Sequence, residues 1–261
     1  MELSARLAAA SADPGELVIC WLGQAGFYLK DHEGTVFLID PYFSNCGERI
    51  RGFKRLSAQL CGPEDIRPDY YCITHTHFDH YDVDAVPVFI AQSDCIFAGP
   101  DSCITALERD GAPRERLRRL NAGTTDTFRA LRITAVKADH GDMAPDAIGI
   151  LLEMGGRRIY FSGDSAYHPE WNAEIRKWQP DIVCPSINGK FGNMDAVEGA
   201  KTAIETGAAW AVPCHFWTFA EHGGDPYAFS QYLQSCSESC RPRLMRQGEI
   251  WNTAEGTGGK E

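Results

Sequence analysis

Three of the eight histidines fall in the short segment His75-Thr76-His77-Phe78-Asp79-His80. Imidazole and carboxylate groups packed this closely repel one another on protonation unless a cation organises them, which disfavours a solvated polar loop. Zinc, manganese and iron all accept this mixed set of nitrogen and oxygen donors. In an extended segment His75, His77 and Asp79 would project to the same side, and a turn just after them would bring His80 round. We therefore predict a site for one or two divalent metal ions, Mn2+ or Zn2+ with Fe2+ as an alternative.

Further donors stand where predicted strands end. His140 follows the apolar stretch 131–138, Asp164 follows 157–163, and His215 follows 209–214. Loops at strand ends are where a rigid scaffold presents functional groups. Taken singly, each residue would more often be a turn residue or a satisfied polar group than a metal ligand. Beside the histidine-rich segment, all three are predicted to complete the metal site.

The elements that must position these residues alternate in type along the chain. Short strands at 17–22, 26–30 and 35–40, separated by glycine-containing turns, predict antiparallel pairing at the start. Beyond Pro68 the pattern alternates strands with helices: strands at 70–74, 95–99, 131–138, 147–154, 157–163, 181–185 and 209–213, and helices at 101–111, 169–178, from Asp195 onward and at 227–240. Asp195 and Glu198 have the spacing of a helix capping box.

This pattern predicts an α/β fold in which two sheets pack together and helices cover the outside. A single domain is expected over residues 1–251, and the polar, glycine-rich segment 252–261 is expected to be a flexible tail.

Composition limits the partners. With 25 Lys and Arg against 36 Asp and Glu the net charge is −11, which argues against nucleic acid and against an anionic membrane surface. The ten cysteines are scattered without a CxxC pair, and residues 1–16 lack a sustained apolar stretch, so a reduced, cytoplasmic protein is expected. Cys20, Cys72, Cys184 and Cys214 are expected to be buried inside strands. A homo-oligomer is left open.

The order of these motifs resembles the metallo-β-lactamase superfamily of hydrolases. The resemblance spans about residues 17 to 225 and rests, in order, on Leu38-Ile39-Asp40-Pro41, the segment 75–80, His140, Ser162-Gly163-Asp164-Ser165 and His215. Within the superfamily the chain is most similar to the L-ascorbate-6-phosphate lactonase group, through Trp21-Leu22-Gly23, Gly99-Pro100, the segments 111–117 and 159–168, and Pro213-Cys214-His215. The resemblance implies an αββα sandwich, the metallo-β-lactamase fold, with two mixed sheets face to face and the metal site along one edge.

The resemblance also implies roles for single residues. One metal would be bound by His75, His77 and His140, a second by Asp79, His80 and His215, and Asp164 would bridge the two. Asp40 would brace the histidine-rich loop from behind. Residues that could line the substrate pocket are Asn188, Lys190, Tyr42, His222 and Trp217. A basic run, Arg49, Arg51, Lys54 and Arg55, could bind a phosphate, although it also fits a solvated loop.

The expected function is metal-dependent hydrolysis, in which a metal-activated hydroxide attacks the substrate and Asp79 orients it and transfers its proton. The first hypothesis is a lactonase that acts on a small anionic, sugar-derived substrate. A phosphodiesterase of the same superfamily, acting on phospholipid head groups or cyclic nucleotides, is the alternative. A metal-binding sensor without turnover is a third reading, and an RNA nuclease fits poorly with the acidic charge.

Overall fold

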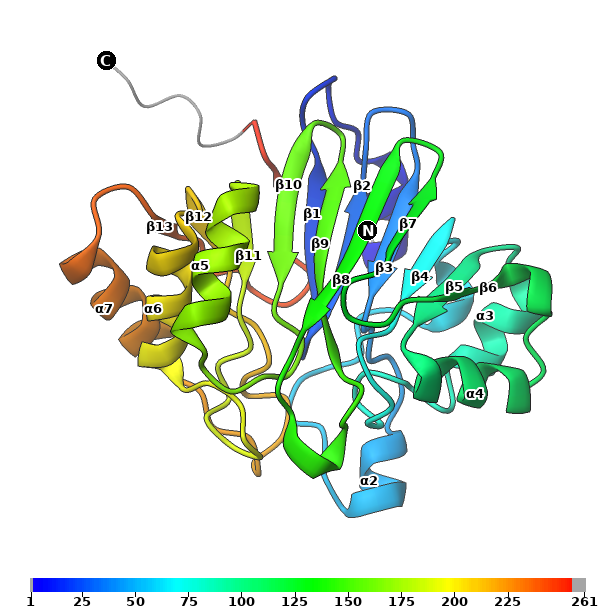
Figure 1. Ribbon diagram of the computed structural model, residues 1–261. Coiled ribbons are helices and arrows are strands. Elements are labelled where there is room, and N and C mark those ends of the chain that lie inside the picture. The colour runs from blue at the N-terminus through cyan, green and yellow to red at the C-terminus, as the bar shows by residue number, and fades with distance from the viewer. Residues whose placement is uncertain (1, 255–261) are drawn as a thin grey trace.

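A computed structural model describes residues 2–254, and in this range the chain forms two mixed β-sheets that lie face to face (Figure 1). In spatial order the first sheet contains β14 (Ile250–Asn252), β1 (Val18–Gly23), β2 (Gly26–Lys30), β3 (Val36–Ile39), β4 (Tyr70–Cys72), β5 (Ile96–Gly99) and β6 (Leu117–Arg119). The second sheet contains β13 (Arg241–Pro242), β12 (Trp210–Ala211), β11 (Ile182–Cys184), β10 (Arg157–Phe161), β9 (Ile148–Met154), β8 (Leu131–Lys137) and β7 (Thr125–Phe128). The predicted pair of packed sheets is confirmed.

Each sheet has an antiparallel half and a parallel half. In the first sheet β14, β1, β2 and β3 pair antiparallel, and β3 to β6 pair parallel. In the second sheet β7 to β10 are antiparallel and β10 to β13 are parallel. The two halves of the chain therefore repeat one plan, in which hairpins precede crossover connections through helices.

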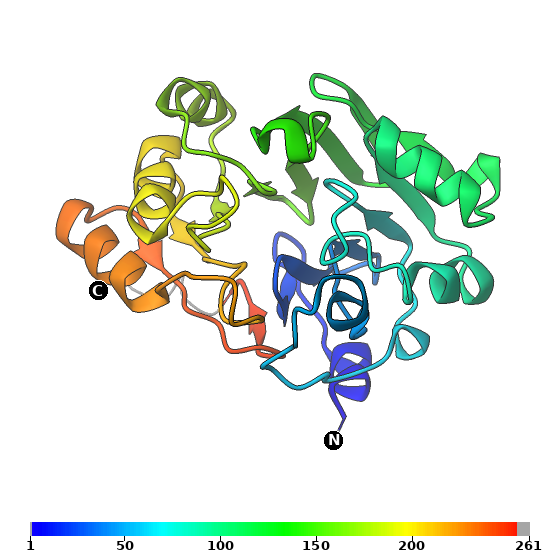
Figure 2. The ribbon, with the colours of Figure 1, turned by 90° about the horizontal axis from the view of Figure 1, so that it is seen from below.

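Helices cover the outer faces of the sandwich (Figures 1 and 2). The helices are α1 (Leu3–Ala9), α2 (Cys46–Arg51), α3 (Val86–Gln92), α4 (Asp101–Arg109), α5 (Pro169–Trp178), α6 (Ala196–Thr206) and α7 (Pro226–Cys236), with short 3-10 turns η1 (Pro63–Asp65), η2 (Arg114–Arg116) and η3 (Gly141–Met143). The predicted helix at 169–178 has these bounds, whereas the last helix ends at Cys236 rather than at 240. Among residues 2–254 no helix is long and apolar enough to cross a bilayer.

The uninterrupted apolar stretches of the sequence are strands buried on both faces. In β1, Ile19 and Trp21 enter the core between the sheets, while Cys20 and Leu22 enter a second core beneath the helices of the first sheet. Because successive side chains of a strand point to opposite faces, a strand covered on both sides needs apolar residues at every position. This explains why the first strands show no alternation with polar residues.

The cysteines belong to these cores. All ten are free, and all except Cys61 and Cys236 are buried. Of the four predicted to be buried in strands, Cys20, Cys72 and Cys184 lie in β1, β4 and β11, whereas Cys214 is buried beyond the end of β12. Burial raises the pKa of the Cys20 thiol to about 12 and that of Cys72 well above its usual value, so both stay protonated.

Four strands of the sheets lie outside the predicted elements, and the longest of them is β7 with four residues. The strands β6, β13 and β14 have two or three residues each, too few to give a periodic pattern. The predicted domain boundary at 251 is also too early, because Asn252 ends β14 and the buried Thr253 Oγ1 accepts a hydrogen bond from Leu17 N at 2.9 Å. Residues 255–261 of the expected tail lie outside the described residues.

The residues expected to do chemistry follow strand ends at one edge of the sandwich. Asp40 follows β3, His75 follows β4, His140 follows β8, Asp164 follows β10 and His215 follows β12. Figure 2, seen from this edge, shows that the loops of both sheets meet here. The site therefore forms only where the two sheets pack together.

The cap of α6 gives a test of the fold. Asp195 Oδ1 accepts hydrogen bonds from Val197 N at 2.8 Å and Glu198 N at 2.9 Å, and Glu198 Oε2 accepts one from Asp195 N at 3.0 Å, as the capping box predicts. We expect Asp195→Ala to lower the free energy of unfolding by about 1 kcal/mol, measured by denaturant titration, because two helix N–H groups lose their acceptor. The control Asp195→Asn keeps an acceptor oxygen and should change little. Equal stability of the two variants would contradict this role.

Candidate metal centre

The loop after β4 changes direction at His77. Thr74 N donates to Asp40 Oδ1 at 2.8 Å, and His80 N donates to His77 O at 2.9 Å, which closes a turn. The prediction that Asp79 projects with His75 and His77 is wrong, because this turn begins two residues earlier than expected. The turn at His77 directs the side chains of Asp79 and His80 toward a second group of donors.

The first donor group consists of three imidazoles. His77 Nδ1 lies 3.0 Å from His75 Nε2 and 3.1 Å from His140 Nε2, so one nitrogen faces two others. Their ligand atoms lie within 4.8 Å of one another. His75 and His140 are buried, and His77 is partly open to the cavity described below.

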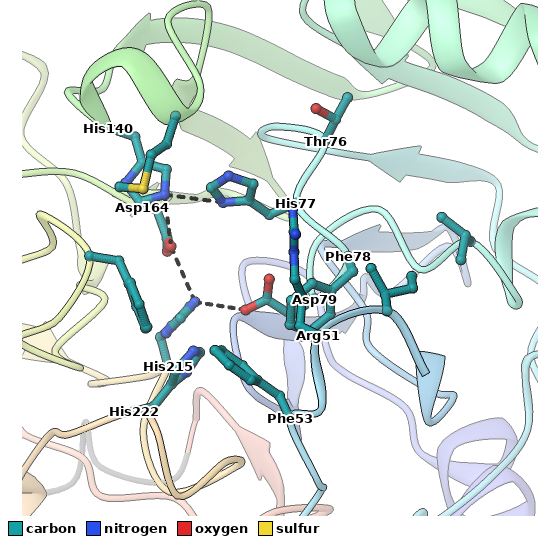
Figure 3. Close-up of a pocket in the computed structure, with 14 residues that line it drawn as sticks. Arg51, Phe53, Thr76, His77, Phe78, Asp79, His140, Asp164, His215 and His222 are labelled. Carbon is teal, nitrogen blue, oxygen red and sulfur yellow. Dashed lines mark hydrogen bonds and ion pairs between the residues drawn. The ribbon is translucent and has the colours of Figure 1, made fainter. Parts of the chain in front are cut away.

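The second donor group consists of Asp79, His80 and His215. His80 Nε2 lies 3.1 Å from His215 Nε2, and Asp79 Oδ2 lies 3.3 Å from His215 Nε2. Asp164 stands between the groups, with Oδ2 3.7 Å from His140 Nε2 and 3.2 Å from His215 Nε2 (Figure 3). The structure thus brings together all seven residues that were predicted as metal ligands.

The spacing and chemistry of these donors fit divalent cations. In a tetrahedral zinc site with bonds of 2.0–2.1 Å, ligand atoms lie about 3.3 Å apart, close to the separations seen here. His77 Nδ1 can share one proton at most, so it cannot hydrogen-bond to both neighbouring nitrogens as a donor. Asp164 Oδ1 is buried without a hydrogen-bond donor. A cation bound in each group would attract these neighbouring lone pairs and so offset the repulsion between them.

Asp40 lies behind this site. Its Oδ2 accepts hydrogen bonds from Thr74 Oγ1 at 2.5 Å and from His80 Nδ1 at 2.8 Å. A proton held on Nδ1 leaves Nε2 of His80 with its lone pair facing Asp164 and His215, as metal binding requires. This is the place that the resemblance implied for Asp40.

Burial keeps the first donor group uncharged. Burial, reinforced by the charge on His80, holds the pKa of His75 well below the usual histidine value and also lowers that of His77. Burial likewise lowers the pKa of His140. At neutral pH these imidazoles are therefore in the form that binds a metal.

The second group carries balanced charges in the absence of a cation. Burial opposes the charged form of His215, but Asp164 and Asp79 outweigh it and raise its pKa to about 9. Burial would raise the pKa of Asp79 and of Asp164, yet His80 and His215 hold both below the usual value. A cation that binds here must displace protons from imidazolium groups, so its affinity weakens as the pH falls.

Gln24 joins this group and is the residue that sequence reasoning missed. It lies fully buried in the β1–β2 hairpin with a positive φ of 50°. Its Nε2 lies 2.6 Å from Asp79 Oδ2, 3.1 Å from His215 Nε2 and 3.1 Å from His222 Nδ1. The amide has two hydrogens for these three neighbours, and the charged Asp79 is the strongest acceptor among them. A signal existed, because Gln24 directly follows the matched residues Trp21-Leu22-Gly23.

A cavity of about 590 Å³ opens above the donors. Of the predicted substrate contacts, His222 lines it, whereas Tyr42, Asn188, Lys190 and Trp217 do not. Tyr42 is buried behind the wall, where its hydroxyl accepts a hydrogen bond from Gly47 N, and Asn188 is also fully buried. Lys190 is exposed to solvent, and Trp217 lines a different hollow. Of the five predicted substrate contacts, the cavity lining therefore includes His222.

The walls consist of residues that the sequence patterns did not single out as a group. They are Ile50, Arg51, Phe53, Phe78, Val83, Met143 and Phe191, together with Thr76. Within the basic run, Arg49 pairs with Asp84 and Arg55 donates to Tyr42 O, so only Arg51 faces the cavity. Spacing along the chain could not reveal these walls because they come from separate loops.

The sequence of this chain is similar to those of known proteins. A family model described as the beta-lactamase superfamily domain matches residues 35–216. A UPF0173 metal-dependent hydrolase of Polynucleobacter asymbioticus is 26% identical over 234 residues, covering 82% of this chain and 79% of the relative.

Two solved structures share the fold. The metallo hydrolase of Ignicoccus hospitalis superposes with a TM-score of 0.73 at 21% identity, over 91% of this chain and 98% of its own. The metallo-beta-lactamase fold protein YhfI of Bacillus subtilis gives 0.68 at 14% identity, over 91% and 99%. The predicted metallo-β-lactamase fold is confirmed.

Removal of one imidazole tests the first donor group. We expect His77→Ala to lower the metal content by about one ion per chain, measured by elemental analysis of the purified protein, because a three-ligand group loses a ligand. The control His32→Ala removes an exposed imidazole from a turn and should leave the metal content unchanged. Full metal occupancy in His77→Ala would overturn the site assignment.

Replacement of Gln24 tests its contact with Asp79. We expect Gln24→Met, which keeps the volume but removes the amide, to lower the free energy of unfolding by about 1–3 kcal/mol, because a buried carboxylate loses its donor. The control Gln231→Met changes an exposed position on α7 and should stay within about 0.5 kcal/mol in the same denaturant titration. If both variants unfold alike, the Gln24 amide contributes nothing to the group.

Proposed function

Since the chain belongs to the beta-lactamase superfamily, we propose that it is a metal-dependent hydrolase that opens a lactone ring in a small anionic substrate. The observation that carries the proposal is the convergence of seven nitrogen and oxygen donors, five of which line one cavity. The UPF0173 relative carries the name metal-dependent hydrolase, which supports the reaction class.

The donor groups define which residues would hold the ions. His75, His77 and His140 would bind one divalent cation, Asp79, His80 and His215 a second, and Asp164 would contact both. A bound divalent cation lowers the pKa of its water toward about 7 and polarises a carbonyl or phosphoryl oxygen.

Asp79 is the residue best placed to handle a proton. It lines the cavity, and although burial opposes its charged form, His80 and His215 hold its pKa low, so that it is an ionised acceptor. It could orient the attacking water and pass a proton to the leaving alkoxide of the opened lactone. Its hydrogen bond from Gln24 fixes the carboxylate in that orientation.

The position of Arg51 supports the hypothesis of an anionic substrate, because this cationic side chain lines the same cavity. The sugar-derived part of the lactonase hypothesis has less support. Asn188 and Lys190, the polar contacts expected for it, lie outside the cavity.

Phosphodiester hydrolysis is the alternative, and one observation favours it. Two donor groups that share a carboxylate are also the arrangement used by two-metal phosphodiesterases. A panel of lactone, phosphodiester and β-lactam substrates separates the two activities. Turnover of phosphodiesters alone would contradict the lactonase proposal, and full metal occupancy with no turnover of any substrate would favour a sensor.

Substitution of Asp79 tests its catalytic role. We expect Asp79→Asn to retain the fold and most of the metal, because the Asn amide keeps an oxygen donor. We expect it to lower kcat for the preferred substrate on the order of 10²–10⁴-fold, because the amide cannot accept the proton. The control Asp142→Asn changes an exposed carboxylate in η3 and should keep full turnover. Near-complete activity in purified, metal-loaded Asp79→Asn would remove this role.

A further inference from the structure

The cavity above the donors is apolar on its walls, although its floor is built from charged and polar groups. Ile50 of α2, Met143 of η3 and Phe191 line it, yet they are 39%, 51% and 45% exposed. These large apolar side chains come from three separate segments and face one space. Exposed apolar side chains around one cavity are typical of a ligand-binding surface, because a ligand that covers them removes apolar area from water.

The wall closest to the reacting groups is aromatic. The Phe53 ring lies 6.0 Å from the His222 ring and 6.1 Å from the Phe191 ring, measured between centroids. The His222 ring in turn stacks on His215 at 4.9 Å. The His222 ring therefore lies between Phe53 and the second donor group. Figure 3 shows Phe53 and Asp79 on the same side of His215.

The local backbone conformation holds the Phe53 and Phe191 rings in the cavity wall. Gly52 ends α2 with a φ of 77°, and Phe53 N then donates to Gly47 O at 3.2 Å, which turns the chain back toward the cavity. Phe191 has a φ of 56° between Gly189 and Gly192, whose φ angles are also positive. A bulky residue seldom adopts this conformation, and here it keeps the Phe191 ring beside Phe53.

Arg51 supplies the charge at this rim. Among the lysines and arginines of residues 2–254 it is the one that lines the cavity, and it is exposed rather than buried in the wall. Its neighbours in the basic run are engaged elsewhere, since Arg49 pairs with Asp84 and Arg55 lies over the Tyr42 ring. A cation next to an apolar wall suits a ligand that has both an anionic group and an apolar body.

We infer that the substrate is a small amphiphilic anion, with a flat apolar body that packs against Phe53 and Phe191 and an anionic group that reaches Arg51. The inference rests on the proposed hydrolytic function of this site and narrows its substrate class. It replaces the polar sugar body of the lactonase hypothesis with an aromatic or similar apolar one.

Binding of three probes to the purified, metal-loaded protein tests the inference by calorimetry. The probes are 4-phenylbutanoate, butanoate, which lacks the ring, and 4-phenylbutan-1-ol, which lacks the charge. We expect 4-phenylbutanoate to bind on the order of ten-fold more tightly than either of the others, because it alone uses both the aromatic wall and Arg51. Equal binding of 4-phenylbutanoate and butanoate would overturn the inference.

Variants assign each contribution to its residue. Phe53→Ala should abolish the advantage of 4-phenylbutanoate over butanoate, and Phe191→Ala, at a half-exposed position that does not endanger folding, should reduce it. Arg51→Ala should abolish the advantage over 4-phenylbutan-1-ol. The control Tyr227→Ala changes an exposed ring in a separate hollow and should leave all three affinities unchanged. Loss of binding in Tyr227→Ala with retention in Phe53→Ala would place the ligand in that other hollow and contradict the inference.

Turnover measurements keep this inference distinct from the proposed function. A ring-dependent affinity without hydrolysis of any lactone or phosphodiester would contradict the function and leave the binding inference standing. Efficient hydrolysis that is equal for polar and aryl-substituted lactones, and unchanged by Phe191→Ala, would retain the function and overturn the inference.

Discussion

The balance of charge in the buried site is the constraint on which the rest of the structure depends. Asp79 and Asp164 are carboxylates with almost no access to water, and imidazoles surround them at hydrogen-bonding distance. Buried carboxylates are costly unless cations or donors compensate them. The sandwich meets this demand by bringing donors from both sheets to one edge, and Asp40 and Gln24 fix their orientation from behind.

The site is consequently a product of the whole fold and not of one loop. The first sheet contributes Asp79 and the neighbouring histidines, while Asp164 and His215 come from the second. Neither sheet alone presents a complete donor group around Asp164. Assembly of the site therefore requires the two sheets to be packed together.

Sequence reasoning could predict the parts that have a local signature. The segment 75–80 places its donors within one loop, and Asp164 follows β10, a strand long enough to show its apolar pattern. Strands as short as β13 and β14 have no period to detect, and the turn at His77 depends on contacts with Asp40 through Thr74. The cavity walls were beyond reach because rings such as Phe53 and Phe191 meet only after folding.

The buried cysteines have a consequence for how metals act on the denatured chain. In the folded protein, burial keeps the thiols of Cys20 and Cys72 protonated, so the ions meet nitrogen and oxygen donors only. Unfolding releases soft sulfur ligands that bind zinc well and manganese poorly. Zinc would then stabilise the unfolded chain as well as the native one, which cancels part of the stabilisation that it gives the native protein during heating. Manganese that binds the native protein with the same affinity as zinc would therefore stabilise the native fold more, because it binds the released thiols poorly.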